Sequence, residues 1–413
     1  MILIYRIIIN VLLLISPIII IFRLFKKKED ISRFKEKFCF FSKKRKKGKV
    51  LWFHGASVGE IKSILPIIEK LSQNKNIDQI LITSNTISSA KIISEIKINK
   101  IVHQYFPIDI NFFSKKFINY WQPNTVFFID SEIWPNMITN IKKKKIPLIL
   151  LNARITKKSF VNWSKIKSFA KTIFNKFDLC LVSNVESKKY LTLLGAKKIK
   201  YIGNIKYAHF ENEKIFINKN LEKFLLNKKV WCASSTHDTE ELFCARIHKE
   251  LRKKYKKLVT IIIPRHINRI DKIKNDLEKL NLVIYVEGQN KRIPNNTDIY
   301  LVNSYGKTKS FFKICKNVFL GGSIIKHGGQ NPLEAAILGC NIIHGPNISN
   351  FNEIYNFLYD NKISHQIKNF NDMISKLDML FFKAKKQIKS NNTINIIGKR
   401  ILKLTLKEIY SYI

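Results

Sequence analysis

The stretch VLWFHGASVGEIKSILPIIEKL (residues 50–71) decides the fold class of this sequence. The apolar run VLWF is followed by a turn with two glycines, HGASVGE (residues 54–60), and then by the amphipathic run IKSILPIIEKL. A strand, a turn and a helix in this order form the repeating unit of a parallel α/β sheet. The turn is expected at the carboxyl end of a strand, where open α/β sheets bind ligands.

The same alternation continues along the chain. It lapses near residues 204–226 and then resumes, and 413 residues are too many for one compact core. We therefore expect an N-terminal Rossmann-like domain over residues 49–210, a hinge over 211–226 and a C-terminal Rossmann-like domain over 227–413, the two domains facing each other across a cleft. The further strand candidates are QILITS, TVFFID, PLILLN and DLCLVS in the first domain, and VWCAS, LVTIIIP, LVIYVEG, DIYLVN, NVFLGG and NIIHG in the second.

The N-terminus favours a membrane anchor over residues 1–25. An uncharged run from Ile7 to Phe22 is followed at once by RLFKKK. About 20 apolar residues cross the hydrocarbon, so the stretch can just span if Arg6 snorkels to the surface. A cleaved signal peptide is the alternative, but no small-residue cleavage site follows. The basic connector over residues 26–48 is suited to anionic head groups, and the positive-inside rule places the rest of the chain in the cytoplasm.

The composition indicates anionic partners. Lys and Arg total 74 against 30 acidic residues, a formal net charge of +44. Much of this excess is lysine scattered among isoleucine and asparagine, and no nucleic-acid recognition motif is present, so we expect no nucleic acid as partner. The six cysteines lie far apart without metal-ligand spacing, which predicts reduced, buried cysteines and no metal site.

Two interpretations of HGASVGE stay open on the residues alone: a helix cap, or a loop that takes part in the chemistry. It lacks the Lys-Ser/Thr pair of a phosphate-binding P-loop, which argues against a Walker ATPase. Ser57 and Glu60 match the S-x-x-E pattern of a capping box ahead of an apolar helix, and the pattern by itself favours this structural role.

A second glycine-rich element, GGSIIKHGGQNPLEAA (residues 321–336), repeats this logic. Asn331 is expected at the N-cap of a helix, Pro332 at its first position and Glu334 at its third. The glycines would let the backbone approach a ligand, and the helix N-terminus would offer N–H groups to an anion. Capping alone explains neither the paired glycines nor the exposed Lys326 and His327 between them.

Two other strand ends carry charged side chains. In FFIDSEIWPN (residues 127–136), Asp130 and Glu132 are expected to face the cleft, and the alternative is a helix start capped by Ser131. In IIIPRHINR, the residues after the strand, Arg265 and His266, suit a phosphate, and the alternative is a solvated basic turn.

Together these fragments resemble the 3-deoxy-D-manno-octulosonic acid (Kdo) transferase family. The resemblance extends over nearly the whole chain, including the N-terminal anchor. The matching fragments, in order, are HGASVGE, YFPID, DSEIWPN, LLNARI, GNIKY, SSTH, PRH and GGS…HGGQNPLEAA.

The resemblance implies an inverting glycosyltransferase of GT-B architecture at the inner membrane. CMP-Kdo would be the donor and the lipid A precursor (lipid IVA) the acceptor in lipopolysaccharide biosynthesis, with no metal and no cofactor. Glu60 would be the general base, and Lys206 of GNIKY would stabilise charge in the transition state. The carboxylate of the next family motif falls on Asp130, and whether Asp130 or Glu132 supports catalysis is left open.

For the nucleotide, the resemblance implies three segments, of which the second departs from the family because Lys307 stands where an acidic residue is expected. They are Pro264 and Arg265; Tyr305, Gly306 and Lys307; and Asn331, Pro332, Leu333 and Glu334. The chemistry agrees, since attack on an activated sugar needs a base, a cationic group and a nucleotide site. The main alternative is another GT-B nucleotide-sugar glycosyltransferase acting on a membrane lipid, and the oligomeric state stays unknown.

Overall fold

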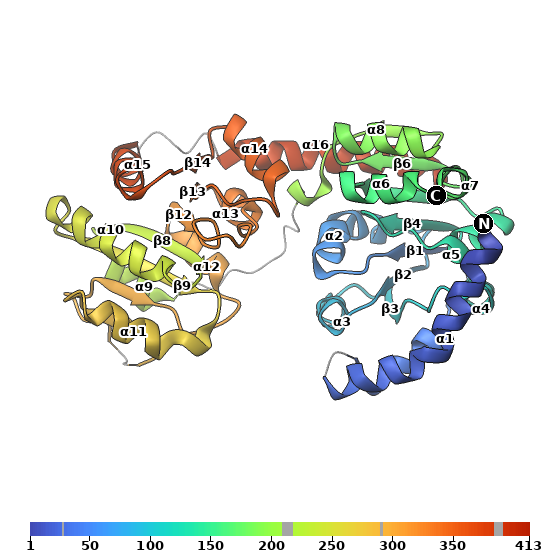
Figure 1. The fold of residues 1–413 in the computed structure, drawn as a ribbon, viewed down its shortest axis with the longest axis horizontal. Helices are drawn as coiled ribbons and strands as arrows, with labels where there is room; N and C mark the ends of the chain where they lie inside the picture. The colour runs from blue at the N-terminus through green and yellow to red at the C-terminus, as the bar shows by residue number, and fades with distance from the viewer. Residues whose placement is uncertain (27–28, 209–217, 290–291, 384–390) are drawn as a thin grey trace. The chain divides into compact units, whose positions relative to one another are not determined.

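The chain forms two compact α/β units, seen in a computed structural model (Figure 1). Unit 1 contains Met1–Glu211 and Gly398–Ile413, and unit 2 contains Asn212–Ile397. The structure describes residues 1–26, 29–208, 218–289, 292–383 and 391–413.

Unit 1 is built on a seven-stranded sheet in the order β3-β2-β1-β4-β5-β6-β7, with parallel pairing throughout. Its strands are β1 (Val50–His54), β2 (Gln79–Ser84), β3 (Ile101–Tyr105), β4 (Thr125–Ile129), β5 (Leu148–Ala153), β6 (Leu179–Val182) and β7 (Ile199–Tyr201). Its helices are α1 (Ile2–Phe25), α2 (Val58–Ser72), α3 (Ile87–Ser94), α4 (Asn111–Trp121), α5 (Pro135–Lys143), α6 (Lys157–Ser164), α7 (Lys167–Phe174) and α8 (Val185–Leu194), with 3-10 turns at Phe34–Phe38 and Ile205–Tyr207.

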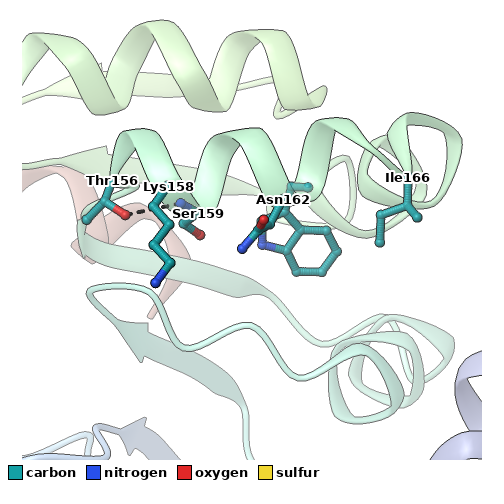
Figure 2. Close-up of a pocket in the computed structure, with 6 residues that line it drawn as sticks. Thr156, Lys158, Ser159, Asn162 and Ile166 are labelled. Carbon is teal, nitrogen blue, oxygen red and sulfur yellow. Dashed lines mark hydrogen bonds between the residues drawn. The ribbon is translucent and has the colours of Figure 1, made fainter.

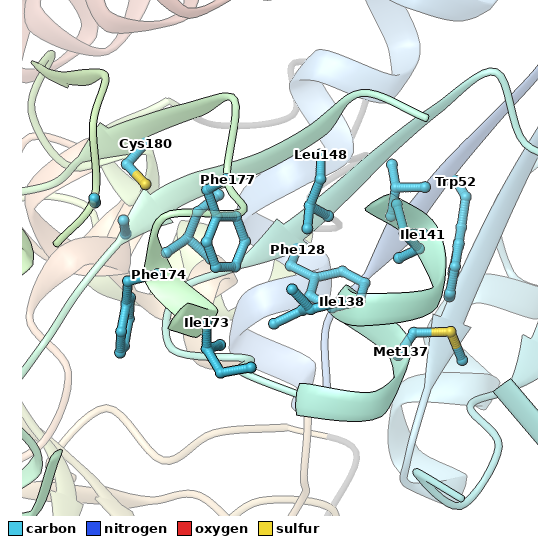
Figure 3. Close-up of a cluster of buried hydrophobic side chains, with 14 of the residues drawn as sticks. Trp52, Phe128, Met137, Ile138, Ile141, Leu148, Ile173, Phe174, Phe177 and Cys180 are labelled. Carbon is cyan, nitrogen blue, oxygen red and sulfur yellow. The ribbon is translucent and has the colours of Figure 1, made fainter. Parts of the chain in front are cut away.

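The core of unit 1 lies between this sheet and its helices. Figure 3 shows Trp52, Phe128 and Leu148 of the strands beside side chains of α5 and α7. Because both faces of a parallel sheet are covered, its strands are continuous apolar runs, and β1, β4 and β5 are buried at every position.

Unit 2 repeats the design with the strand order β10-β11-β9-β8-β12-β13-β14, again with parallel pairing. Its strands are β8 (Lys229–Thr236), β9 (Leu258–Pro264), β10 (Ile284–Val286), β11 (Ile299–Leu301), β12 (Asn317–Leu320), β13 (Asn341–His344) and β14 (Ser364–Gln366). Its helices are α9 (Lys219–Leu225), α10 (Glu240–Lys254), α11 (Ile270–Glu278), α12 (Thr308–Ile314), α13 (Leu333–Ile337), α14 (Asn352–Asp360) and α15 (Phe370–Lys383), with a 3-10 turn at Ile267–Arg269. The last helix, α16 (Asn391–Ile409), and the 3-10 turn Tyr410–Tyr412 end the chain.

The strand order of each sheet reverses beside its first strand. In unit 1 the reversal lies between β1 and β4, and in unit 2 it lies between β8 and β12. Ligands of open α/β sheets bind beyond the carboxyl ends of the strands at such a point, because the loops there diverge to opposite faces. The prediction of parallel α/β domains is confirmed, and the reversals mark the loops HGASVGE, DSEIW, SSTH and GGS as candidate sites.

The end of the chain departs from the expected division. The second domain was expected to extend over residues 227–413, but Gly398–Ile413 belongs to unit 1. A Cβ atom on Gly398 would lie 2.3 Å from the carbonyl oxygen of Tyr207, so only glycine allows this approach. The Nζ of Lys49 donates to the final carbonyl at 2.6 Å. Part of the expected hinge, residues 211–217, lies outside the described residues.

Helix α1 forms where the anchor was predicted, and it is docked on unit 1. The Tyr5 hydroxyl donates to Asp109 at 2.8 Å, and the Arg6 Nε donates to Asn136 at 2.9 Å rather than extending toward a membrane surface. Its exposed apolar side chains include Leu3, Ile4, Ile7, Ile8, Val11 and Leu14. Among the described residues, which leave out the side chains of residues 15, 17–21 and 24, no helix is both long and apolar enough to cross a membrane, so the predicted span has no support here.

We predict that Tyr5→Phe lowers the free energy of unfolding by about 1–3 kcal/mol, the usual effect of removing one partner of a buried polar group. Asp109 is buried, and burial raises the pKa of its carboxyl to about 6, so the loss of a donor leaves it poorly satisfied. The phenyl ring of the variant keeps the contact with Phe169. Urea unfolding measures the change.

The matched control is Tyr359→Phe, because Tyr359 is 65% exposed and should change stability by no more than about 0.5 kcal/mol. Equal unfolding midpoints for the two variants would show that the hydrogen bond to Asp109 does not fasten α1.

Candidate active site

The carboxylate of Glu60 completes a capping box at the start of α2. The Glu60 amide donates to the Ser57 hydroxyl, and the Glu60 carboxylate accepts from the amide of Ala56 at 2.7 Å and from the Ser57 hydroxyl at 2.8 Å. The structural interpretation of HGASVGE is therefore confirmed. The same carboxylate lies past the end of β1, at the strand-order reversal, so capping does not remove it from the ligand-binding edge.

The pKa of Glu60 is raised above its usual value. Burial is the largest cause, and the negative charges of Glu132 and Asp130 add to it, while hydrogen bonds from Ser57 and Ala56 oppose it. A carboxylate whose charge is disfavoured in this way is a stronger base than a free one.

Asp130 is paired with Lys206 from a segment 76 residues away. The Lys206 Nζ lies 2.6 Å from the Asp130 Oδ2, and the amide of Asn152 donates to the Asp130 Oδ1. Asn152 also accepts from the amide of Ile205 at 2.9 Å, which fixes the turn that carries Lys206. The strand ends of β4 and β5 thus position the lysine, although nothing in the sequence spacing singles out Asn152 except its place at a strand end.

Two residues of this group have left-handed backbone. The φ angles are 54° at Asp130 and 51° at Asn152, values that few residues other than glycine adopt. Such strain persists only where surrounding contacts over-determine it, and it is frequent at functional sites.

Glu132 has different partners from Asp130. Its Oε2 accepts from the Trp134 indole at 2.8 Å and lies 3.1 Å from the His54 Nε2. Burial alone would raise the pKa of Glu132, but the hydrogen bonds from His54 and Trp134 and the charge of His54 lower it. The His54 ring stacks on Phe106 of the YFPID fragment at 3.8 Å. Glu132 is therefore a weak base held in place, whereas Glu60 is the basic one.

In unit 2 a buried carboxylate occupies the glycine-rich turn after β12. Glu240, at the start of α10, accepts from the amides of His237, Gly322, Ser323 and Ile324 at 2.7–3.2 Å. These backbone amides are consequently unavailable to a bound anion. Glu240 was not among the predicted residues, and the available signal was an acid in the first helical turn after a strand end.

Histidine and arginine side chains lie at the same edge. The rings of His237 and His327 lie 4.2 Å apart beside Gly322, where a Cβ atom would approach both rings at 3.2–3.3 Å. Burial, with the charges of His327, His266, Arg265 and Arg269, lowers the pKa of His237 to about 4. The Arg265 side chain, after β9, is exposed.

The remaining predicted nucleotide residues lie in three places on unit 2. Pro264 ends β9. Tyr305 is 65% exposed, a Cβ atom at Gly306 would meet open space, and Lys307 pairs with Glu287 at 3.1 Å. The third group comprises Asn331, Pro332, Leu333 and Glu334 at α13.

The predicted capping of α13 is wrong in detail. The helix begins at Leu333, with Pro332 rather than Asn331 at the N-cap, because Asn331 forms a turn in which its side chain accepts from the Leu333 amide at 3.1 Å. The Glu334 side chain makes no capping bond, is 44% exposed and lies 4.0 Å from the Lys309 Nζ. Its carboxylate is thus accessible to a ligand.

All six cysteines are buried and free, as predicted. Across the described residues, no group of three His, Cys, Asp or Glu side chains is arranged to hold a metal ion.

Comparison with known proteins gives consistent results. A family model described as 3-deoxy-D-manno-octulosonic-acid transferase (kdotransferase) matches residues 32–209. The 3-deoxy-D-manno-octulosonic acid transferase of Rickettsia bellii is 37% identical over 374 residues, which cover 89% of this chain and 88% of the relative.

Among solved structures, UDP-GlcNAc 2-epimerase from Neisseria meningitidis matches with a TM-score of 0.60 and 16% identity over 87% of this chain and 100% of its own. Trehalose-6-phosphate synthase matches with a TM-score of 0.51 and 10% identity over 88% and 98% of the two chains. These likenesses concern the fold alone, which is that of GT-B glycosyltransferases.

We predict that Glu240→Gln lowers the free energy of unfolding by about 1–3 kcal/mol. The amide nitrogen of glutamine would face backbone N–H donors that now share two carboxylate oxygens, so at least one donor loses its partner. Thermal and urea unfolding measure the loss. Glu250→Gln on the exposed part of the same helix is the control, and an equal effect of both changes would contradict the role of Glu240.

Proposed function

The chain belongs to the Kdo transferase family and is therefore a glycosyltransferase, and we propose that it transfers Kdo from CMP-Kdo to the lipid A precursor in lipopolysaccharide biosynthesis. The observation that carries the proposal is the Glu60 carboxylate, which has a raised pKa and lies at the strand-order reversal of unit 1. Family membership alone specifies neither the donor nor the acceptor.

The proposed reaction is one inverting displacement. A hydroxyl of the acceptor attacks the anomeric carbon of Kdo, and Glu60 takes the hydroxyl proton. The bond from that carbon to the phosphate oxygen breaks, and CMP leaves with the electron pair. General base catalysis of this kind typically contributes 10²–10⁴-fold to the rate.

Lys206 supplies positive charge for this step. Its Nζ is held at 2.6 Å from Asp130, so the ammonium is fixed before substrate arrives and costs little reorganisation. Of the two acids Asp130 and Glu132, Asp130 is the one that supports catalysis in this scheme, because the Glu132 carboxylate is hydrogen-bonded to His54 and Trp134.

Unit 2 would hold the donor. Arg265 is exposed after β9 and can meet a phosphate with its planar guanidinium. Glu334 is accessible and can accept from ribose hydroxyls, with Pro264, Tyr305, Gly306, Lys307, Asn331, Pro332 and Leu333 completing the nucleotide site. The leaving phosphate of CMP bears less charge than a diphosphate, so cationic side chains suffice in this scheme.

We also propose that the enzyme works on the cytoplasmic side of the inner membrane. Support comes from the apolar residues that α1 exposes, among them Leu3, Ile7 and Leu14, and from the basic connector after it. An anionic surface attracts such a connector with about 1 kcal/mol per basic residue. The acceptor, as a lipid, would be met at that surface.

The first test is Glu60→Gln, assayed with CMP-Kdo and a tetraacylated, bisphosphorylated disaccharide lipid, with products weighed by mass spectrometry. Glutamine keeps the size and can occupy the same capping position but cannot take a proton. Turnover should fall about 10²-fold or more, while CMP affinity and melting temperature change little. In the wild type, kcat should fall as the pH drops through the raised pKa of Glu60, because only the ionised carboxylate accepts a proton.

Ser57→Ala is the matched control. It removes the other half of the capping box and should lower stability by about 1 kcal/mol with a modest loss of rate. Near-normal single-turnover transfer by Glu60→Gln would remove Glu60 from the mechanism.

The nucleotide site is tested by Glu334→Ala. Since Glu334 makes no capping bond, the change should leave the melting temperature nearly unaltered and weaken CMP binding by about 10-fold, the scale of one lost hydrogen bond to a charged group. Isothermal titration with CMP measures the affinity. Unchanged affinity would exclude Glu334 from the site.

A further inference from the structure

Unit 1 has a surface cavity away from the capping box. Its volume is about 400 Å³, and it is formed by α6 and its flanks (Figure 2). In Figure 2, Thr156, Lys158 and Ser159 lie toward one end of the helix and Ile166 toward the other. The lining residues are Thr156, Lys158, Ser159, Asn162, Trp163 and Ile166, so the cavity is polar at one end and apolar at the other.

Packing of the fold accounts for Trp163 but not for the exposed aliphatic side chains beside it. No residue of α6 is buried, although the helix carries several apolar side chains, and Val161 and Ile166 are 46% and 37% exposed. Trp163 is held in place by Phe174 at 5.2 Å and Phe169 at 6.2 Å. A half-buried tryptophan beside exposed aliphatic side chains provides an apolar wall for a ligand.

The segment that forms the cavity carries charge of one sign. Residues 154–177 contain no aspartate or glutamate. Lys158 has no acidic partner within the part of the chain that the structure describes. A ligand of this surface should therefore carry negative charge. The basic residues of the segment are Arg154, Lys157, Lys158, Lys165, Lys167, Lys171 and Lys176.

The segment that forms the cavity is linked by contacts both to the candidate active site and to helix α1. At its polar end, Thr156 comes two residues after Arg154, whose amide donates to the Asp130 carbonyl at 3.1 Å. At its apolar end, Phe169 contacts both Trp163 and Tyr5 of α1 at ring distances of 6.2 and 6.1 Å. An amphiphile bound here would have its polar part near the reacting edge and its chains near α1.

We propose that this cavity binds the acceptor, an anionic glycolipid, with a phosphate at Lys158, Ser159 and Asn162 and an acyl chain along Trp163 and Ile166. The inference rests on the proposed function for the identity of the lipid. It adds a recognition site on unit 1 that is separate from Glu60 and from the nucleotide residues.

The test uses the full chain and two variants. Lys158→Glu should raise the KM for the tetraacylated, bisphosphorylated disaccharide lipid about 10-fold or more, with kcat at saturating acceptor and CMP affinity unchanged. Lys157→Glu is the matched control, because it makes the same charge change at an exposed neighbour that does not line the cavity, and it should alter KM less than about 2-fold.

Ile166→Asn tests the apolar end. Residue 166 is the N-cap of α7, where asparagine is favoured, so the variant should remain folded while losing apolar contact and should raise the acceptor KM several-fold. Circular dichroism melting checks the fold of each variant.

A binding measurement without donor separates this inference from the proposed function. The disaccharide lipid and phosphatidylglycerol are each dispersed in neutral detergent micelles, and affinity is followed by tryptophan fluorescence. Selective loss of disaccharide-lipid binding in Lys158→Glu supports the acceptor site even if no transfer from CMP-Kdo is detected, which would count against the proposed function alone. Equal loss for both lipids would indicate a general membrane contact and overturn the proposal, as would unchanged KM and binding in an active enzyme.

Discussion

The parallel pairing of β1 with β4 is the constraint on which the candidate site depends. Because these strands are neighbours on either side of the strand-order reversal, the loops that follow them begin at the same edge of the sheet. The capping carboxylate of Glu60 and the loop of Asp130 and Glu132 are thereby brought within electrostatic range, which the raised pKa of Glu60 reflects. A different strand order would separate Glu60 from Asp130, which lie 70 residues apart in the sequence.

Carboxylates organise the backbone at the edges of both sheets. Glu60 holds the amide of Ala56, and Glu240 holds four amides around the turn after β12. The consequences differ, since Glu60 stays partly exposed and basic, whereas Glu240 is fully buried and fills the place that an anion could occupy. The same chemical group therefore marks the proposed catalytic position in unit 1 and a structural position in unit 2.

Much of the fold could be predicted because buried parallel strands are continuous apolar runs, as VLWFH and LVTIIIP illustrate. The strands IVHQY, IKY and SHQ were missed because they are short or interrupted by polar residues at the sheet margins. In the site, the acids were predictable from strand ends. Their pairings were not, since the contacts of Asp130 with Lys206 and of Glu132 with His54 depend on tertiary structure rather than on spacing.

The return of Gly398–Ile413 to unit 1 has a consequence for the translation and folding of the chain. At about 5–20 residues per second, a ribosome needs on the order of ten seconds or longer to make Asn212–Ile397 before the closing segment emerges. During that delay, the surface that Ile401 and Ile409 later cover stays exposed. Both side chains are buried in the finished protein. The first unit to be translated is consequently completed only after the second unit has been made.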